Sequence, residues 1–261
     1  MAESILRPIH VWLNVINALL LRDIRTRAGK FYTGYLVIFL MPFAHLAVVL
    51  VVLTVLNRAP PIGTQPVIFY GLSVLPFVIF VYPARQLLMA LPMNRPLLYF
   101  PRVKIVDVMV ARAILETANG MAVAGVVLLV LFLATSEFEP RDPAGIMWAL
   151  LLTLYVGIAW GAYNSLIATL FPFWFLAFNL CFPLIWMASG ILINVHGLPA
   201  VIRDYLAFNP VLQCIEYIRY SYYEGYPVDI LDPAYAFWFA TCLLAFALLI
   251  ERLFRRQLLS M

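Results

Sequence analysis

Residues capable of catalysis are few in this 261-residue chain, and they lie far apart. The 3 histidines are His10, His45 and His196, and the sequence contains neither a His-Glu-x-x-His metal motif nor a Gly-x-Ser-x-Gly nucleophile elbow. The one Gly-Lys pair, Gly29-Lys30, is followed by Phe31, where a phosphate-binding P-loop needs Ser or Thr. The 3 cysteines form no Cys-x-x-Cys pair. We therefore expect no enzyme activity, no catalytic or metal-ligating residue and no cofactor in this chain.

Ionisable side chains near apolar segments are better explained by contacts within or between helices than by catalysis. Glu216 and Arg219 are three residues apart, so they can form an ion pair if the segment is helical. Glu116 follows Arg112 by four residues, and a helical pair is again the simplest interpretation. His45 lies inside an apolar run, where we favour a hydrogen bond between helices over a proton relay.

The segment around Glu216 has apolar stretches too short to cross a bilayer. Asn209 followed by Pro210 predicts a helix cap and a first helical residue, and thus a helix that ends near Tyr223. A second short helix is expected over 199–207. We predict that the two dip into the outer leaflet as re-entrant helices within 198–226, and a loop lying on the membrane surface is the alternative. The residues of interest in this outer element are Asn209, Pro210, Glu216, Arg219, Tyr220 and Tyr223.

Aromatic and basic residues mark two further segments. Six of the 14 tyrosines lie between Tyr205 and Tyr226, where they can anchor the chain at the bilayer interface or stack on sugar rings. The segment 94–104 mixes cations, aromatic residues and two prolines. It either sets the orientation of the chain or docks into a cleft of a cytoplasmic partner.

The composition indicates the class of structure that positions these residues. Hydrophobic residues make up 65% of the chain and charged residues 11%, whereas a soluble domain has about 25% charged residues. Long uncharged runs favour helices over the alternating segments of a membrane barrel. We predict an all-α integral membrane protein with six transmembrane helices, near 31–56, 66–86, 112–136, 145–170, 173–194 and 233–252.

Charges in the connecting segments predict the orientation. Thirteen of the 17 Lys and Arg residues lie before the first span, around the loop 87–111 or in the C-terminal tail. Eight of the 13 acidic residues lie on the other side. The positive-inside rule therefore places both termini in the cytoplasm. The net charge of +4 reflects this topology, and we expect no nucleic-acid partner.

Residues 1–30 precede the six-span domain 31–261. A signal peptide would carry its positive charges before the apolar stretch, but here Arg22, Arg25 and Arg27 follow it. Apolar residues recur at helical spacing and polar residues lie opposite them, so we expect an amphipathic helix at the membrane surface.

Small residues recur at every fourth position of the fourth span. They are Thr153, Gly157, Gly161, Ser165 and Thr169. Such a stripe allows another helix to approach closely. We favour packing inside the subunit, and a contact between two subunits is the alternative.

Two motifs resemble those of a known family. The first is Leu20-Leu21-Arg22-Asp23-Ile24-Arg25-Thr26-Arg27, followed by Gly34-Tyr35 and Pro42. The second is Asn209-Pro210-Val211-Leu212-Gln213-Cys214-Ile215-Glu216-Tyr217-Ile218-Arg219, followed by Gly225-Tyr226. Over nearly its whole length the chain is similar to the permease subunits of type-2 ABC exporters for capsular polysaccharide, which are related to O-antigen exporters. A histidine often stands at Gln213 in that family, so no role of the ring is transferred.

The resemblance implies a channel subunit of an ATP-driven exporter that moves a lipid-linked capsular polysaccharide across the bacterial inner membrane to the periplasm. It implies a homodimer with two separate ATPase subunits that bind ATP and Mg, a periplasmic co-polymerase or adaptor, and an outer-membrane export protein. The residues implied to couple to the ATPases are Arg22, Asp23, Arg25, Arg27, Asn94, Arg95, Tyr99, Arg102 and Lys104. Spans one and five would border the channel, and its lining candidates are Tyr35, Phe39, Phe43, Phe175, Phe178, Phe182 and Trp186. Ordinary lipid-facing aromatics are the alternative for the last group.

Other functions are weighed against this one. A type-2 permease for O-antigen, a lipid or a drug would share the architecture. A membrane-embedded glycolipid transferase would need a membrane-facing cluster of acids, bases or metal ligands, and the spans hold none. A simple scaffold would not need the basic aromatic segment at 94–104.

Overall fold

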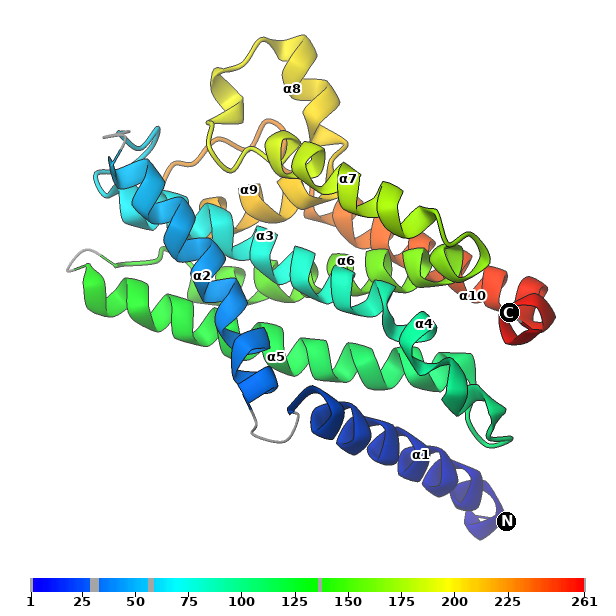
Figure 1. Ribbon diagram of the computed structural model, residues 1–261. Helices are drawn as coiled ribbons and strands as arrows, with labels where there is room; N and C mark the ends of the chain where they lie inside the picture. Colours follow the sequence, from blue (N-terminus) through cyan, green and yellow to red (C-terminus); the bar gives the residue numbers. More distant parts are fainter. Residues whose placement is uncertain (1, 29–32, 56–58, 136–137, 261) are drawn as a thin grey trace.

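The computed structural model of the protein describes residues 2–28, 33–55, 59–135 and 138–260, and the regular elements of this part of the chain are all helical. The elements are α1 (Ala2–Ala28), α2 (Thr33–Val55), α3 (Pro66–Leu88), α4 (Ala90–Asn94), η1 (Arg95–Tyr99), α5 (Ile105–Ala134), α6 (Pro143–Leu170), α7 (Trp174–Ala188), η2 (Val195–Gly197), α8 (Ala200–Ala207), α9 (Pro210–Tyr222) and α10 (Pro233–Ser260). Figure 1 shows a bundle in which α1 begins and α10 ends at the same end. We call this the inner end, and the end near α8 and α9 the outer end.

Four helices, α3, α5, α6 and α10, are long and apolar enough to cross a membrane. Two shorter apolar helices accompany them, Leu40–Leu53 within α2 and Trp174–Ala188, which is α7. Large apolar side chains such as Leu133, Trp148 and Leu180 are exposed on the outside of the bundle, where only lipid or another apolar surface would suit them. The chain is therefore an all-helical integral membrane protein.

The centre of the bundle is α3, which packs most extensively against α6. At Gly157 of α6 a Cβ atom would lie 2.8 Å from the carbonyl oxygen of Phe80, and at Gly161 it would lie 2.7 Å from that of Ala84. Only glycine allows the two backbones to come this close. The small-residue stripe thus packs inside the subunit, and the interpretation favoured from the sequence is confirmed.

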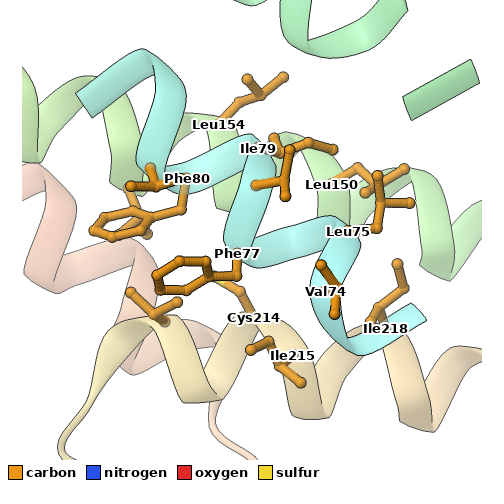
Figure 2. Packing of buried hydrophobic residues seen from close by; sticks show 14 of the residues in the cluster. Val74, Leu75, Phe77, Ile79, Phe80, Leu150, Leu154, Cys214, Ile215 and Ile218 are labelled. Carbon is orange, nitrogen blue, oxygen red and sulfur yellow. The ribbon is translucent and has the colours of Figure 1, made fainter. Parts of the chain in front are cut away.

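The short helix α9 completes this core from the outer side. Figure 2 shows its side chains Ile215 and Ile218 against Val74 and Phe77 of α3, with Leu150 of α6 nearby. All five are buried. An apolar face of α9 is thereby removed from water and lipid, which fixes the helix to the two central spans.

The fifth predicted span is shorter than expected. The sequence predicted a helix over 173–194, but α7 ends at Ala188 because Gly190 adopts a φ of 65°, a left-handed conformation that stops the helix. A Cβ atom at Gly190 would lie 2.7 Å from Val195, so the turn is also tightly packed. With 15 residues, α7 extends over about 22 Å.

The predicted loop 87–111 is largely helical. It contains α4, η1 and the first seven residues of α5, where the sequence predicted a span that starts near 112. The start of α5 is fixed by a capping box, in which the Asp107 carboxylate accepts from the backbone N–H of Lys104 at 2.9 Å. Its first turns bury Val108 and Ala111 against Ile16 and Leu19 of α1. The hydropathy of α5 alone does not predict this tertiary contact.

The two terminal helices compare differently with the prediction, since α1 lies within the expected segment 1–30 and α10 extends beyond its expected end. Helix α1 runs alongside the first turns of α5 in the same direction, since Trp12 bonds to Asp107 and Arg27 to Glu116. Helix α10 continues to Ser260, where the sequence placed the end of the span near 252. Its last turns pack Leu258 against the inner end of the bundle.

Candidate functional site

A buried ion pair lies in α9 at the outer end. The Glu216 carboxylate and the Arg219 guanidinium are 3.0 Å apart, and both side chains are fully buried. The pair predicted from their spacing is thus confirmed. Nε and Nη2 of Arg219 also donate to the hydroxyl of Ser73 in α3 at 3.0 and 2.7 Å. Nη2 donates to the carbonyl oxygen of Gly190 at 2.8 Å, and the guanidinium lies 4.4 Å from the centre of the Phe69 ring.

The second oxygen of Glu216 is held by two residues outside α9. His196 Nε2 lies 2.9 Å from this oxygen, and the Tyr226 hydroxyl donates to it at 3.0 Å. The hydrogen bond to Glu216 raises the pKa of His196, and the nearby carboxylate of Asp229 acts in the same direction. No pattern in the sequence pointed to His196, which is 20 positions from its partner.

This set of residues joins five segments. We call it the outer clamp, and it consists of Ser73, His196, Glu216, Arg219 and Tyr226, together with the Gly190 carbonyl. Buried charges are tolerated here because each is paired and hydrogen-bonded. Removing Glu216 would leave the buried Arg219 without a counter-charge, and removing Arg219 would leave Glu216 with His196 and Tyr226 alone, so the clamp makes the position of α9 dependent on both residues.

The first turns of α9 are also fixed by polar contacts. The Asn209 side chain accepts from the backbone N–H of Val211 at 3.0 Å, so the predicted cap with Pro210 as the first helical residue is confirmed. Gln213 donates to the carbonyl oxygens of Ala207 and Ile230 at 2.8 and 2.9 Å. The glutamine thus ties α9 to the segments before and after it.

The position of α9 along α6 shows how far it reaches into the bundle. Cys214 of α9 lies close to Thr153 of α6, which is about 15 Å along α6 from its first residue. The other end of α9 returns to the start of α6, where the Asp142 N–H donates to the Ser221 carbonyl at 2.8 Å. Helix α9 therefore begins deep between α3 and α6 and ends at the outer end of the bundle.

The tyrosines of the outer element divide into two groups. Tyr223 is half-buried and its ring contacts Phe69 and Tyr226, while Tyr220 is half-buried beneath the guanidinium of Arg141. Tyr205 on α8 is 75% exposed. The first group stabilises the clamp region, and Tyr205 is placed to meet lipid or another molecule.

At the inner end, four of the predicted coupling residues turn toward the protein. Arg22 donates to Asn94 at 2.6 Å. Asp23 pairs with Arg112, and Arg27 pairs with Glu116 at 2.5 Å. These contacts tie α1 to α4 and to the start of α5. Arg112 and Glu116, which the sequence explained as a pair within one helix, are 3.9 Å apart and bond more closely to α1.

The remaining coupling candidates surround the tip between η1 and α5. Tyr99 is 86% exposed, and Arg102 and Lys104 are exposed beside it. Arg95 is half-buried, and Arg25 is exposed on α1. The predicted coupling set thus separates into an internal group that joins α1 to the bundle and an exposed basic aromatic tip.

The aromatic residues predicted to line a channel do not form one surface. Phe178 and Phe182 are buried inside the subunit, Phe43 and Trp186 are half-buried, and Phe175 is exposed. The side chains of Tyr35 and Phe39 lie outside the described part of the structure. Within one subunit, therefore, Phe178 and Phe182 pack in the interior and are not exposed on its surface.

Comparison with known proteins places this architecture among export proteins. No protein-family model matches the chain. The chain is 31% identical over 214 residues to the polysialic acid transport protein KpsM of Escherichia coli, which covers 81% of this chain and 82% of KpsM. It is 29% identical over 237 residues to the capsule polysaccharide export inner-membrane protein CtrC of Neisseria meningitidis, covering 90% and 88%. The corresponding protein BexB of Haemophilus influenzae is 26% identical over 210 residues, covering 80% and 79%.

Proposed function

Because the chain belongs to the family of capsule polysaccharide export inner-membrane proteins and is a permease subunit of a polysaccharide exporter, we propose that it forms the channel of an ATP-driven exporter. Its substrate would be a lipid-linked capsular polysaccharide, moved from the cytoplasm to the periplasm. The similarity extends over most of the chain and of each relative, so the proposal concerns the whole described bundle.

The observation that carries the proposal is the position of α9. This helix of 13 residues, about 20 Å long, is too short to cross a bilayer, yet it holds buried charges between two central spans. We infer that α8 and α9 are a re-entrant pair on the periplasmic side. The spans would then be α2, α3, α5, α6 and α10, and the apolar α7 together with the residues that follow it up to 194 would complete the sixth crossing, with both termini in the cytoplasm. The basic inner end supports this orientation.

A channel for a polymer must be enclosed on all sides, so one copy of the bundle needs a second subunit to complete it. We propose a homodimer in which α2 and α7 of each subunit border the path. Both helices expose large apolar side chains, among them Met41, Val48, Phe175 and Leu184. Contact of such apolar surfaces with water would be unfavourable, so a second subunit or lipid must cover them.

Energy would come from separate subunits. We propose two ATPase subunits that bind ATP and Mg and contact the exposed tip around Tyr99, Arg102 and Lys104. The contacts of Arg22, Asp23 and Arg27 would transmit their movement through α1 to α5. A periplasmic co-polymerase or adaptor and an outer-membrane export protein would continue the path beyond α8.

The test is to delete the gene and determine where the polysaccharide collects. An exporter predicts full-length polysaccharide inside the cell and little at the surface, with surface display restored by the gene on a plasmid. Loss of synthesis would instead support a transferase, and normal surface display would contradict both functions. Copurification of the tagged permease with a P-loop ATPase tests the proposed energy source separately.

A further inference from the structure

Arg85 is the one exposed residue of α3. The other residues of this central helix are buried or half-buried. A charge in the last turn of a span can serve orientation alone, since cations are favourable at helix C-termini. The surroundings of Arg85 indicate a further role, because its side chain packs against the neighbouring helix α7.

Three helices meet at Arg85. Its guanidinium lies 4.5 Å from the centre of the Phe182 ring of α7. Tyr82 precedes Arg85 by about one turn of α3, and its ring lies 6.3 Å from the ring of His45 of α2. Figure 1 shows α3 between α2 and α7, the two helices proposed to border the path. Arg85 therefore lies where the central helix reaches the proposed channel.

No described carboxylate is within ion-pair distance of Arg85. The acidic side chains described at the inner end have other partners: Asp23 and Glu116 pair with Arg112 and Arg27, Asp107 bonds to Trp12, and Glu251 pairs with Arg255. Stacking on an aromatic ring uses the face of a guanidinium and leaves its N–H edge open. That edge matches two oxygens of a carboxylate or phosphate.

We propose that Arg85 binds an anionic oxygen group of the transported molecule at the inner end of the path, either a phosphate of the lipid anchor or a carboxylate of the glycan. Phe182 of α7 holds the guanidinium, and the ring pair of Tyr82 and His45 joins this part of α3 to α2. In a dimer each subunit supplies one such site. This inference rests on the proposed function, because it needs α2 and α7 to border the path.

The experiment measures binding to the permease–ATPase complex in phosphatidylcholine nanodiscs. Two anionic probes are used, a fluorescent short-chain phosphatidylglycerol and a fluorescent oligosialic acid. The neutral counterparts are the matching diacylglycerol and a neutral oligosaccharide. Loss of a charge-assisted bidentate contact predicts a roughly tenfold weaker affinity in Arg85→Gln for an anionic probe. Arg256→Gln removes another exposed cation, from α10, and should leave both affinities unchanged.

Each outcome decides the proposal. Loss of phosphatidylglycerol binding alone assigns the site to the lipid phosphate, and loss of oligosialic acid binding alone assigns it to the glycan carboxylate. Affinities within about twofold of wild type for both probes overturn it. If Arg85→Gln does not fold, Arg85→Lys decides, because a lysine keeps the charge but not the planar fork, and an unchanged affinity overturns the site. A wild-type complex that binds neither probe, while the gene still restores capsule, overturns this site and leaves the proposed function intact.

Discussion

Glu216 and Arg219 form an ion pair of 3.0 Å from which both solvent and lipid are excluded. The pair lies in a helix of only 13 residues, and its hydrogen bonds reach α3 and the turn after α7. The relationship makes one short helix the point at which several spans are joined. Because the pair is buried, removing one partner should cost far more free energy of folding than the intact pair contributes.

Glu216→Ala should impair export far more than Asp229→Ala. The first change leaves Arg219 buried without its counter-charge, at a cost of roughly 3–5 kcal/mol. Asp229 is 51% exposed, bonds to Arg203 and lies 3.6 Å from Nδ1 of His196, so its loss should cost little. Surface polysaccharide is measured for both variants at equal membrane abundance. Equal export from the two variants would contradict the role of the clamp.

The close contact between α6 and α3 predicts a second effect. In Gly157→Ala the new methyl group would meet the Phe80 backbone at 2.8 Å, so we expect a loss of about 1–3 kcal/mol in stability. Gly125→Ala in α5 is the matched control, because no atom lies within 4 Å of the added Cβ. There alanine should be neutral or stabilise the helix by up to about 1 kcal/mol. Melting temperatures in one detergent compare the two, and equal shifts would argue against the packing.

The sequence predicted those features that depend on local pattern. Hydropathy located the helices, the spacing of Glu216 and Arg219 predicted their pair, and Asn209-Pro210 predicted the start of α9. Each of these signals lies within a few residues. Packing of the stripe around Gly157 was also favoured correctly, since glycine at helical spacing has few other uses in a span.

Long-range partners could not be predicted in this way. Ser73 is 146 positions from Arg219, and a serine in an apolar run carries no sign of its partner. Arg85 was counted among the charges that set orientation, because its contact with Phe182 depends on how α7 crosses α3. The early end of α7 depends on a left-handed turn at Gly190, which an apolar run conceals.

The stability of the outer clamp should depend on pH through His196. Its hydrogen bond to Glu216 raises the pKa of His196, so the folded chain holds the proton more tightly than the unfolded chain. The stabilisation is complete below about pH 6.5, the usual histidine value, and is lost as the pH rises through the raised pKa. The melting temperature of the wild type should therefore fall between about pH 6 and 9.

The control for this effect is His196→Gln, which keeps a donor but does not titrate. Its melting temperature should depend less on pH than that of the wild type, whereas His10→Gln on the exposed side of α1 should behave like the wild type. If all three proteins show the same pH profile, His196 does not contribute to the pH dependence.

The contact between Asp23 and Arg112 predicts a defect in coupling rather than in assembly. Asp23→Asn keeps the shape of the side chain but removes its charge, while Arg112 retains its bonds to the carbonyl and the side chain of Gln86. We expect α1 to stay helical but to follow α5 less tightly, so that ATP turnover persists while polysaccharide export falls several-fold. The ratio of the two rates in reconstituted vesicles measures this, with Asn17→Ala, an exposed change on α1, as the control. A parallel loss of both rates would indicate misfolding, and an unchanged ratio would show that the contact carries no movement between the helices.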